Sequence, residues 1–151
     1  MKKTKWNGRF SVISENPYII LDGAHNKDGA EKLIESLKRN FNGKKINYIF
    51  GVFSDKDYKG IIEITAPFAK HIITTQTPKN SRALNAKILE EAVKKVNTSV
   101  EAISDVEEAV KKGIEITSSN DVLVIFGSLS FLGKAWETVY KIKEGVKTDG
   151  Q

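Results

Sequence analysis

An acid, a histidine and an amide follow one another closely at the end of an apolar run. The run is Tyr18 to Leu21, and Asp22, His25 and Asn26 come just after it. A carboxylate accepts hydrogen bonds from hydroxyl groups, and an imidazole can stack on a ring or donate a hydrogen bond. Four consecutive bulky residues are typical of a strand buried on both faces, and ligands of open α/β sheets bind beyond the carboxyl ends of such strands. We therefore expect a binding site here; the alternative is a capping aspartate and a surface histidine.

The same turn is expected to begin a helix. Apolar residues follow helical spacing from residue 28 to Phe41, and either Asn26 or Asp28 can cap the first turn. The free backbone N–H groups at a helix N-terminus favour negative charge. A ligand with an anionic group would therefore suit this turn.

Four more polar residues stand near expected strands. Arg9 begins an alternating segment, Asp55 and Lys56 follow a buried strand, and Ser128 follows the most apolar strand of the chain. The Arg9 guanidinium can make two parallel hydrogen bonds to an anion, although a surface charge at a strand edge is the alternative. Ser128 can bond a carboxylate, or it can simply cap the helix that follows.

A metal site is not expected in this chain. It contains no cysteine, and its two histidines are His25 and His71. His71 begins a short β-branched strand, so we expect it to be incidental to function. Without cysteine the chain also has neither disulfides nor a thiolate nucleophile.

Length and composition are those of a globular domain. The chain has 151 residues, which we read as one domain over 1–151, with 28% charged residues, a net charge of +5 and a pI near 9.3. Its lysines are scattered with acids between them, so we expect no nucleic-acid partner. No apolar run could span a membrane and no signal peptide is visible, so we expect no membrane contact and a cytoplasmic location.

Strand and helix signals alternate along the whole chain. A segment at 9–14 and a turn at 15–17 predict an antiparallel hairpin arm, and a capping box at 104–107 predicts a helix start at Ser104. The pattern favours an α/β, Rossmann-like doubly wound fold: a mostly parallel sheet of about six strands with helices on both faces. Expected strands lie at 9–14, 18–22, 46–53, 71–75, 100–103 and 121–126, and expected helices at 28–41, 58–66, 88–96, 106–114 and 131–140.

Four motifs in one order carry a family resemblance. They are Trp-Asn-Gly-Arg-Phe at 6–10, Ile-Leu-Asp-Gly-Ala-His-Asn at 20–26, Asp-Lys-Asp at 55–57 and Phe-Gly-Ser-Leu at 126–129. Together they resemble the C-terminal domain of folylpolyglutamate synthase/dihydrofolate synthase, a branch of the Mur ligase superfamily. The similarity covers about residues 6–140. Two departures are Lys27, where the family commonly has proline, and Asn7 in place of the usual proline before Gly-Arg.

The resemblance implies a role for most of the candidate residues. Asp22 and His25 would contact the ribose and adenine side of ATP, and Asn26 would hold that turn together. Arg9 would reach the triphosphate end as the catalytic residue. Ser128 would lie close to the incoming L-glutamate. The resemblance assigns no role to Asp55 and Lys56, which could form a structural ion pair or contact substrate.

No Gly-x-x-x-x-Gly-Lys-[Ser/Thr] phosphate loop occurs in the chain. The resemblance therefore implies that an N-terminal P-loop domain is absent here and would be the chain's partner in the complete enzyme. That domain would bind most of the Mg²⁺, and the ligase would use ATP, folate and L-glutamate through an acyl phosphate. This chain alone is then expected to be inactive. The alternative is a stand-alone nucleotide-binding or regulatory module without ligase activity.

Overall fold

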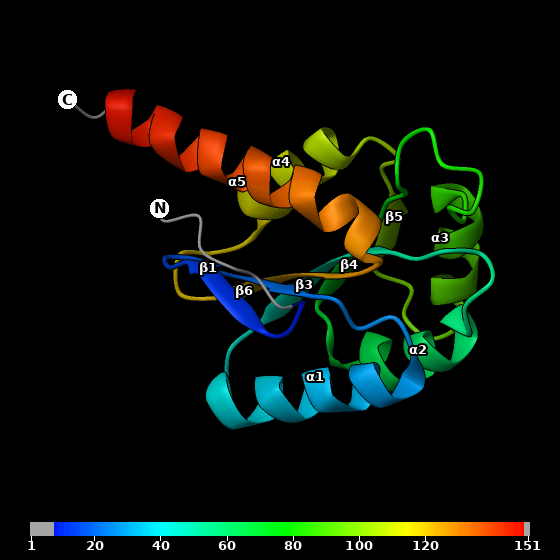
Figure 1. The fold of residues 1–151 in the computed structure, drawn as a ribbon. Helices are drawn as coiled ribbons and strands as arrows, with labels where there is room; N and C mark the ends of the chain where they lie inside the picture. Colours follow the sequence, from blue (N-terminus) through cyan, green and yellow to red (C-terminus); the bar gives the residue numbers. More distant parts are fainter. Residues whose placement is uncertain (1–7, 150–151) are drawn as a thin grey trace.

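A computed structural model describes residues 8–149 of the chain. Trp6 and Asn7, which belong to the first family motif, lie outside the described residues. One six-stranded sheet runs through the molecule with the order β1-β2-β6-β3-β4-β5 (Figure 1). Its strands are β1 (Ser11–Ser14), β2 (Tyr18–Asp22), β3 (Ile46–Gly51), β4 (His71–Thr74), β5 (Val100–Ala102) and β6 (Val122–Gly127).

The directions of the strands confirm the predicted architecture. β1 pairs with β2 antiparallel, and every other neighbouring pair in the sheet is parallel. The turn between β1 and β2 contains a cis peptide bond between Asn16 and Pro17. The expected hairpin arm is therefore present, although its first strand begins at Ser11 rather than at residue 9.

Helices cover both faces of the sheet, as expected for a doubly wound fold. α1 and α2 lie on one side of the sheet, and α4 and α5 lie on the other (Figure 1). The buried residues of α3 join the same hydrophobic cluster as those of α1 and α2. The helices are α1 (Lys27–Asn40), α2 (Tyr58–Thr65), α3 (Ala86–Lys94), α4 (Val106–Ile116) and α5 (Leu129–Asp149), with a short 3₁₀ helix, η1 (Ala66–Phe68), after α2.

The sheet separates two hydrophobic clusters, and the two central strands β3 and β6 contribute to both. Every residue of these two strands is buried, which is why their sequences read as continuous apolar runs rather than as alternating patterns. Alternate residues then point to opposite faces: Val124 and Phe126 join the cluster under α1, and Leu123 and Ile125 join the cluster under α4 and α5.

Some helix boundaries differ from those expected. α4 begins one residue later than the predicted capping box, because the Asp105 side chain, not that of Ser104, accepts the N–H of Glu108. α2 ends at Thr65, one residue before the expected end, and Pro67 lies in the first turn of η1, where its missing N–H costs nothing. The last helix continues to Asp149, beyond the apolar positions from which residues 131–140 were predicted.

The most consequential feature of the topology is the position of β6. The chain passes from β2 through α1 to β3 and leaves a gap between these strands, and β6 later fills it after α4 has returned over the other face. Helices after β2 and β3 lie on one face, whereas the helix after β6 lies on the other. Crevices therefore open on both sides of the carboxyl end of β6, where α/β sheets bind ligands.

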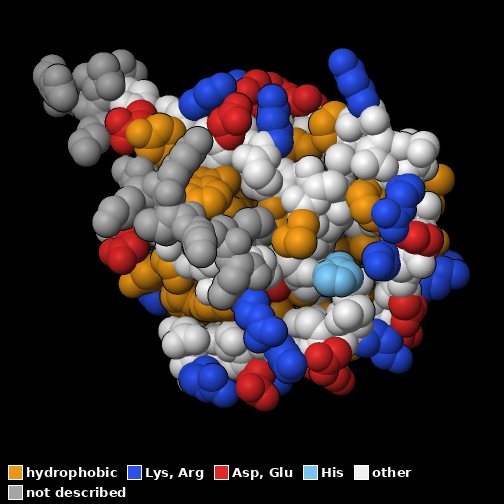
Figure 2. Space-filling view, in the orientation of Figure 1, with side chains coloured by type: hydrophobic (Ala, Val, Ile, Leu, Met, Phe, Trp, Pro, Cys, Tyr) orange, Lys and Arg blue, Asp and Glu red, His pale blue; other side chains and the backbone are white. Residues whose placement is uncertain are grey.

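The surface shows no segregation of charge on the face drawn in Figure 2. Lys and Arg side chains in blue are interspersed with Asp and Glu side chains in red around its rim. Within α1, two pairs of charged side chains form ion pairs: Lys32 with Asp28 and Arg39 with Glu35. Across residues 8–149 no helix is long and apolar enough to cross a membrane.

Candidate functional site

The carboxyl ends of β2 and β6 bring two of the predicted site segments together. Asp22 at the end of β2 is the register partner of Phe126 in β6, so Gly127 and Ser128 follow beside the turn that carries His25. Leu129 begins α5 over this turn, and 53% of its surface is exposed. His25 and Leu129 line two clefts, one on each side of the end of β6.

Gly23 makes the close contact between these segments possible. A Cβ on Gly23 would lie 2.6 Å from Leu129 Cδ2 and 2.9 Å from the Gly8 carbonyl oxygen. The Gly23 N–H donates to that same carbonyl at 2.8 Å. This hydrogen bond ties the segment before β1 to the turn after β2, and it places Arg9, which precedes β1, near Asp22 at the end of β2.

Asp22 is a nearly buried carboxylate. It is 9% exposed, and its Oδ1 accepts the backbone N–H of Ala24 at 2.8 Å. Burial raises the pKa of Asp22 from 3.8 to about 6, and the N–H groups of Ala24 and Phe10 and the charge of Arg9 offset part of this effect. Asp22 is therefore mostly ionised at pH 7, yet it is short of water and well suited to accept hydrogen bonds from ligand hydroxyl groups.

His25 and Asn26 are both exposed and both fix the local backbone. His25 Nδ1 lies 2.8 Å from the carbonyl oxygen of Gly23. Because a carbonyl only accepts, Nδ1 carries the proton, and Nε2 is the acceptor of the neutral ring. Asn26 is the N-cap of α1, and its Oδ1 accepts the N–H of Gly29 at 2.8 Å. The structure thus gives Asn26 the role of holding the turn.

The larger cleft has a volume of about 550 Å³, within the range of small-molecule sites. It brings together four of the sequence-predicted site residues. The cleft is surrounded by acidic and amide groups, an imidazole, one guanidinium and the first turn of α1. The lining residues that matter here are Arg9, Asp22, His25, Asn26 and Gly29.

The smaller cleft, of about 220 Å³, lies on the other side of the β6 end. Two cations, Lys56 and Arg82, line it together with Ser128 and Ser130. Ser128 is buried, and its N–H donates to the Gly51 carbonyl at 2.9 Å. This strand-to-helix turn needs glycine at 127, because φ is +121° there and a Cβ would collide with the Gly51 carbonyl oxygen.

The two residues without an assigned role separate in the structure. Asp55 pairs with Arg82 at 2.9 Å, and this hydrogen bond holds the pKa of the Asp55 carboxyl below its usual range. Arg82 also lies over the Phe53 ring at 4.4 Å. Asp55 thus forms an ion pair, one of the two alternatives, whereas the Lys56 side chain lines the cleft. Arg82 was missed from the sequence, since it lies in a loop with no strand or helix signal.

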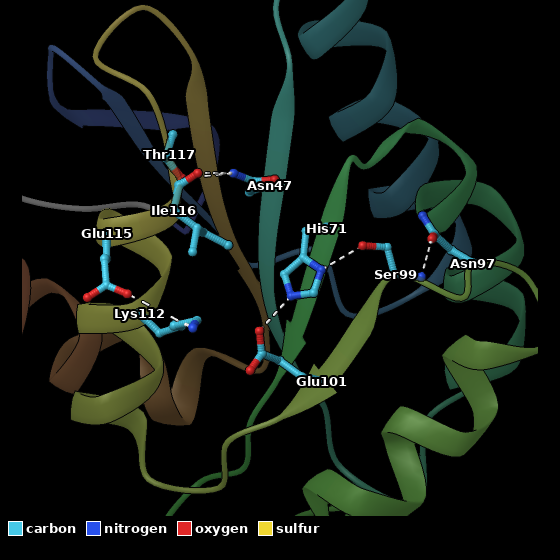
Figure 3. A network of polar contacts seen from close by, with 9 residues as sticks. All are labelled: Asn47, His71, Asn97, Ser99, Glu101, Lys112, Glu115, Ile116 and Thr117. Carbon is cyan, nitrogen blue, oxygen red and sulfur yellow. Dashed lines mark hydrogen bonds and ion pairs between the residues drawn. The ribbon is translucent and has the colours of Figure 1, made fainter.

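His71 lies at the amino end of β4, whereas the clefts open at the carboxyl ends of the strands. Its Nδ1 is 2.7 Å from Ser99 Oγ, and its Nε2 is 2.7 Å from Glu101 (Figure 3). It therefore joins β4 to the edge strand β5. Over residues 8–149, no three His, Cys, Asp or Glu side chains gather in one place.

Known proteins share this domain. The family model described as "Mur ligase, glutamate ligase domain" matches residues 8–129. A dihydrofolate synthase/folylpolyglutamate synthase of Bacillus subtilis is 35% identical over 132 residues, which are 86% of this chain and 30% of that protein. The solved folylpolyglutamate synthase of Thermotoga maritima superposes with a TM-score of 0.75 at 34% identity, covering 89% of this chain and 31% of that one.

A third similar protein was solved with ligands. It is a bifunctional folylpolyglutamate synthase/dihydrofolate synthase with Mn, AMPPNP and L-glutamate bound, 27% identical, with a TM-score of 0.73, covering 97% of this chain and 33% of that one. The chain thus spans about one third of the length of these relatives. The family match covers most of the sequence and every lining residue of the two clefts except Ser130, and the chain therefore belongs to the Mur ligase glutamate ligase domain family.

Proposed function

We propose that this chain is the C-terminal domain of an ATP-dependent ligase that adds L-glutamate to folate. One observation carries the proposal: two clefts of different chemistry meet at the end of β6 and share His25 and Leu129 as a common wall. One cleft suits a nucleoside and its phosphates, and the other suits an anionic amino acid. A ligase needs these two substrates side by side.

The larger cleft is the proposed nucleotide site. The ionised Asp22 carboxylate would accept the ribose hydroxyls, and the His25 ring would lie against the base. The first turn of α1 and the Arg9 guanidinium both favour negative charge, which supports phosphates on this side. The smaller cleft is the proposed glutamate site, where Lys56, Arg82 and the Ser128 hydroxyl would hold the carboxylates.

The proposed reaction has two steps. A folate carboxylate oxygen attacks the γ-phosphorus of ATP, and the bond to ADP breaks. The glutamate amine then attacks the acyl carbon, the amide forms and phosphate leaves. Charge grows on phosphoryl oxygens in the first step, so a fixed cation such as Arg9 gives its largest stabilisation there. The metal and the phosphate loop would come from a P-loop domain, the proposed partner of this chain.

The proposal is tested by substitutions in the enzyme that unites this chain with its P-loop partner. Asp22→Ala and His25→Ala should raise KM for ATP more than they lower kcat, because ribose and adenine contacts are equal in ground and transition states. Glu31→Ala, at an exposed residue of α1 that lines neither cleft, is the control. Equal losses of turnover at an unchanged KM for ATP would contradict the nucleotide assignment.

A further inference from the structure

Three hydroxyl groups form a continuous chain beside the smaller cleft. Ser128 Oγ lies 2.6 Å from Ser130 Oγ, which in turn lies 2.5 Å from Thr77 Oγ1. Thr77 belongs to the loop after β4 and is 9% exposed, whereas both serines line the cleft. The chain of hydroxyls therefore joins two buried residues, Thr77 and Ser128, through Ser130, which is exposed at the cleft.

The hydrogen bonds available to Ser128 restrict where its hydrogen can point. A hydroxyl carries one hydrogen and accepts at two lone pairs. The Ser130 backbone N–H lies 3.3 Å from Ser128 Oγ and occupies one lone pair. When the Ser130 hydroxyl donates to the second lone pair, the Ser128 hydrogen has no other acceptor among residues 8–149 and is left for a ligand in the cleft.

Thr77 decides whether Ser130 can donate in that direction. If the Thr77 hydroxyl donates to Ser130 Oγ, the Ser130 hydrogen is released toward Ser128. Hydrogen bonds arranged head to tail also polarise one another, so each donor in the chain strengthens the next. A carboxylate in the cleft accepts only, and it would therefore select the order in which Thr77 donates to Ser130 and Ser130 to Ser128.

We infer that Ser130 and Thr77 are positioning residues that hold the Ser128 hydroxyl as a donor toward the carboxylate of the amino-acid substrate. This inference rests on the proposed function, which places glutamate in the smaller cleft. Lys56 and Arg82 supply the positive charge that brings a carboxylate to this cleft. The hydroxyl chain supplies the directional donor, and neither residue of the chain beyond Ser128 needs to touch the carboxylate itself.

The test is a titration of the 151-residue chain with L-glutamate, followed by the amide chemical shifts of residues 128–130. Thr77→Val removes the hydroxyl while keeping the shape of the side chain, and Ser130→Ala keeps the backbone N–H. Each should weaken glutamate binding by about 5- to 10-fold, the usual effect of losing one hydrogen bond. Thr77→Ser should restore binding, and Thr98→Val, at an exposed threonine before β5, should leave it unchanged.

Thermal melting of the same variants separates positioning from structure. If Thr77 only ties the β4 loop to α5, Thr77→Val will melt earlier but bind glutamate as tightly as the wild type, and the inference is overturned while the proposed function stands. If the wild-type chain shows no saturable shift at residues 128–130 in tens of millimolar glutamate, the glutamate site itself is wrong and the inference is overturned with it.

Discussion

Asp22 is an acidic residue whose environment is unlike that of an exposed carboxylate. Its carboxyl lies almost buried at the end of β2, and its pKa is raised to about 6. A carboxylate kept in this state costs folding free energy, and groups with strongly shifted pKa values cluster at functional sites. The cost can be measured in the chain without any ligand.

Stability should fall as the pH rises from about 4.5 to 6. In this window the folded state holds the Asp22 proton that the unfolded state has lost, so the unfolded state binds fewer protons and the free energy of unfolding decreases. The decrease due to Asp22 is at most about 3 kcal/mol. Asp55 and Glu90, whose pKa values are lowered by Arg82 and Lys87, act in the opposite direction at lower pH.

Urea unfolding at several pH values measures how the free energy of unfolding changes with pH. Asp22→Ala should abolish this change, whatever the variant does to absolute stability. Asp28→Ala, which removes an exposed carboxylate paired with Lys32, should keep it. If the wild-type chain were equally stable at pH 4.5 and pH 6, Asp22 would not be buried as the structure has it.

Arg9 should matter for chemistry and not for folding. It is exposed and precedes β1, so Arg9→Ala should change stability by about 0.5 kcal/mol or less. Losing a charge-assisted contact to the transferred phosphoryl group should lower turnover by roughly 100- to 1000-fold. Arg9→Lys should recover part of the loss, since a point charge cannot reproduce the bidentate fork.

Single-turnover formation of ADP by the complete enzyme at saturating ATP measures the effect. Arg39→Ala, at an exposed arginine of α1 that pairs with Glu35, is the control. A variant at Arg9 that melts early and reacts normally once folded would show that this arginine is structural.

The sequence predicted those site residues that lie close together in the chain, and it missed one that reaches the site from a distant segment. Asp22, His25 and Asn26 lie within one strand-to-helix turn, and the apolar run before them predicted their place at a carboxyl end. Arg82 could not be predicted in the same way, because its loop returns to Asp55 across 27 positions of the chain. No propensity or periodicity encodes such a contact.

At the scale of elements, the turn from β6 into α5 is the most constrained. Gly127 approaches the Gly51 backbone so closely that no side chain fits, and its φ of +121° strains any other residue. Gly127→Ala should therefore destabilise the chain by more than about 2 kcal/mol and displace Ser128. Gly133→Ala, at an exposed position in the second turn of α5 with open space around it, should stabilise by roughly 0.5–1 kcal/mol.

Chemical denaturation of the two alanine variants tests this pair. Both substitutions add one methyl group to a glycine. Opposite changes in the free energy of unfolding would therefore come from the different backbone conformation and surroundings of the two positions. A Gly127→Ala variant as stable as the wild type would mean that β3 and β6 do not approach as closely as the structure shows.

The start of a helix could be predicted where the N-cap was among the expected residues. It was missed where two neighbouring residues could both act as the N-cap. Asn26 caps α1 as one of the two expected residues, but Asp105 prevails over the neighbouring Ser104 at α4. Adjacent capping residues offer the same hydrogen bond, so the sequence alone does not decide between them. The last turns of α5 were missed because the apolar stripe ends before the helix does.

At the scale of the whole molecule, the sequence predicted the class of fold but not the order of the strands. Alternating strand and helix signals predicted a parallel sheet covered on both faces, and the structure confirms it. The insertion of β6 between β2 and β3 depends on contacts between segments about 100 residues apart in the chain. This insertion is what brings Ser128 to the turn of Asp22.

The 151-residue chain by itself should not turn over ATP, folate and glutamate. It holds no phosphate loop, and in our proposal half of the active site belongs to the partner domain. Nucleotide binding should be no tighter than about the millimolar range, near −4 kcal/mol. Folate glutamylation by the purified chain, measured against a reaction without enzyme, would refute the need for the partner.

The central claim is that two separate ligand sites meet at the end of β6, and amide chemical-shift mapping of the chain tests it most directly. ADP should shift the amides of residues 22–29 around Asp22 and the first turn of α1, and L-glutamate should shift those of residues 128–130. Residues of the shared wall, His25 and Leu129, should respond to both ligands. Shifts from both ligands in one common set of residues, or in neither set, would contradict the claim.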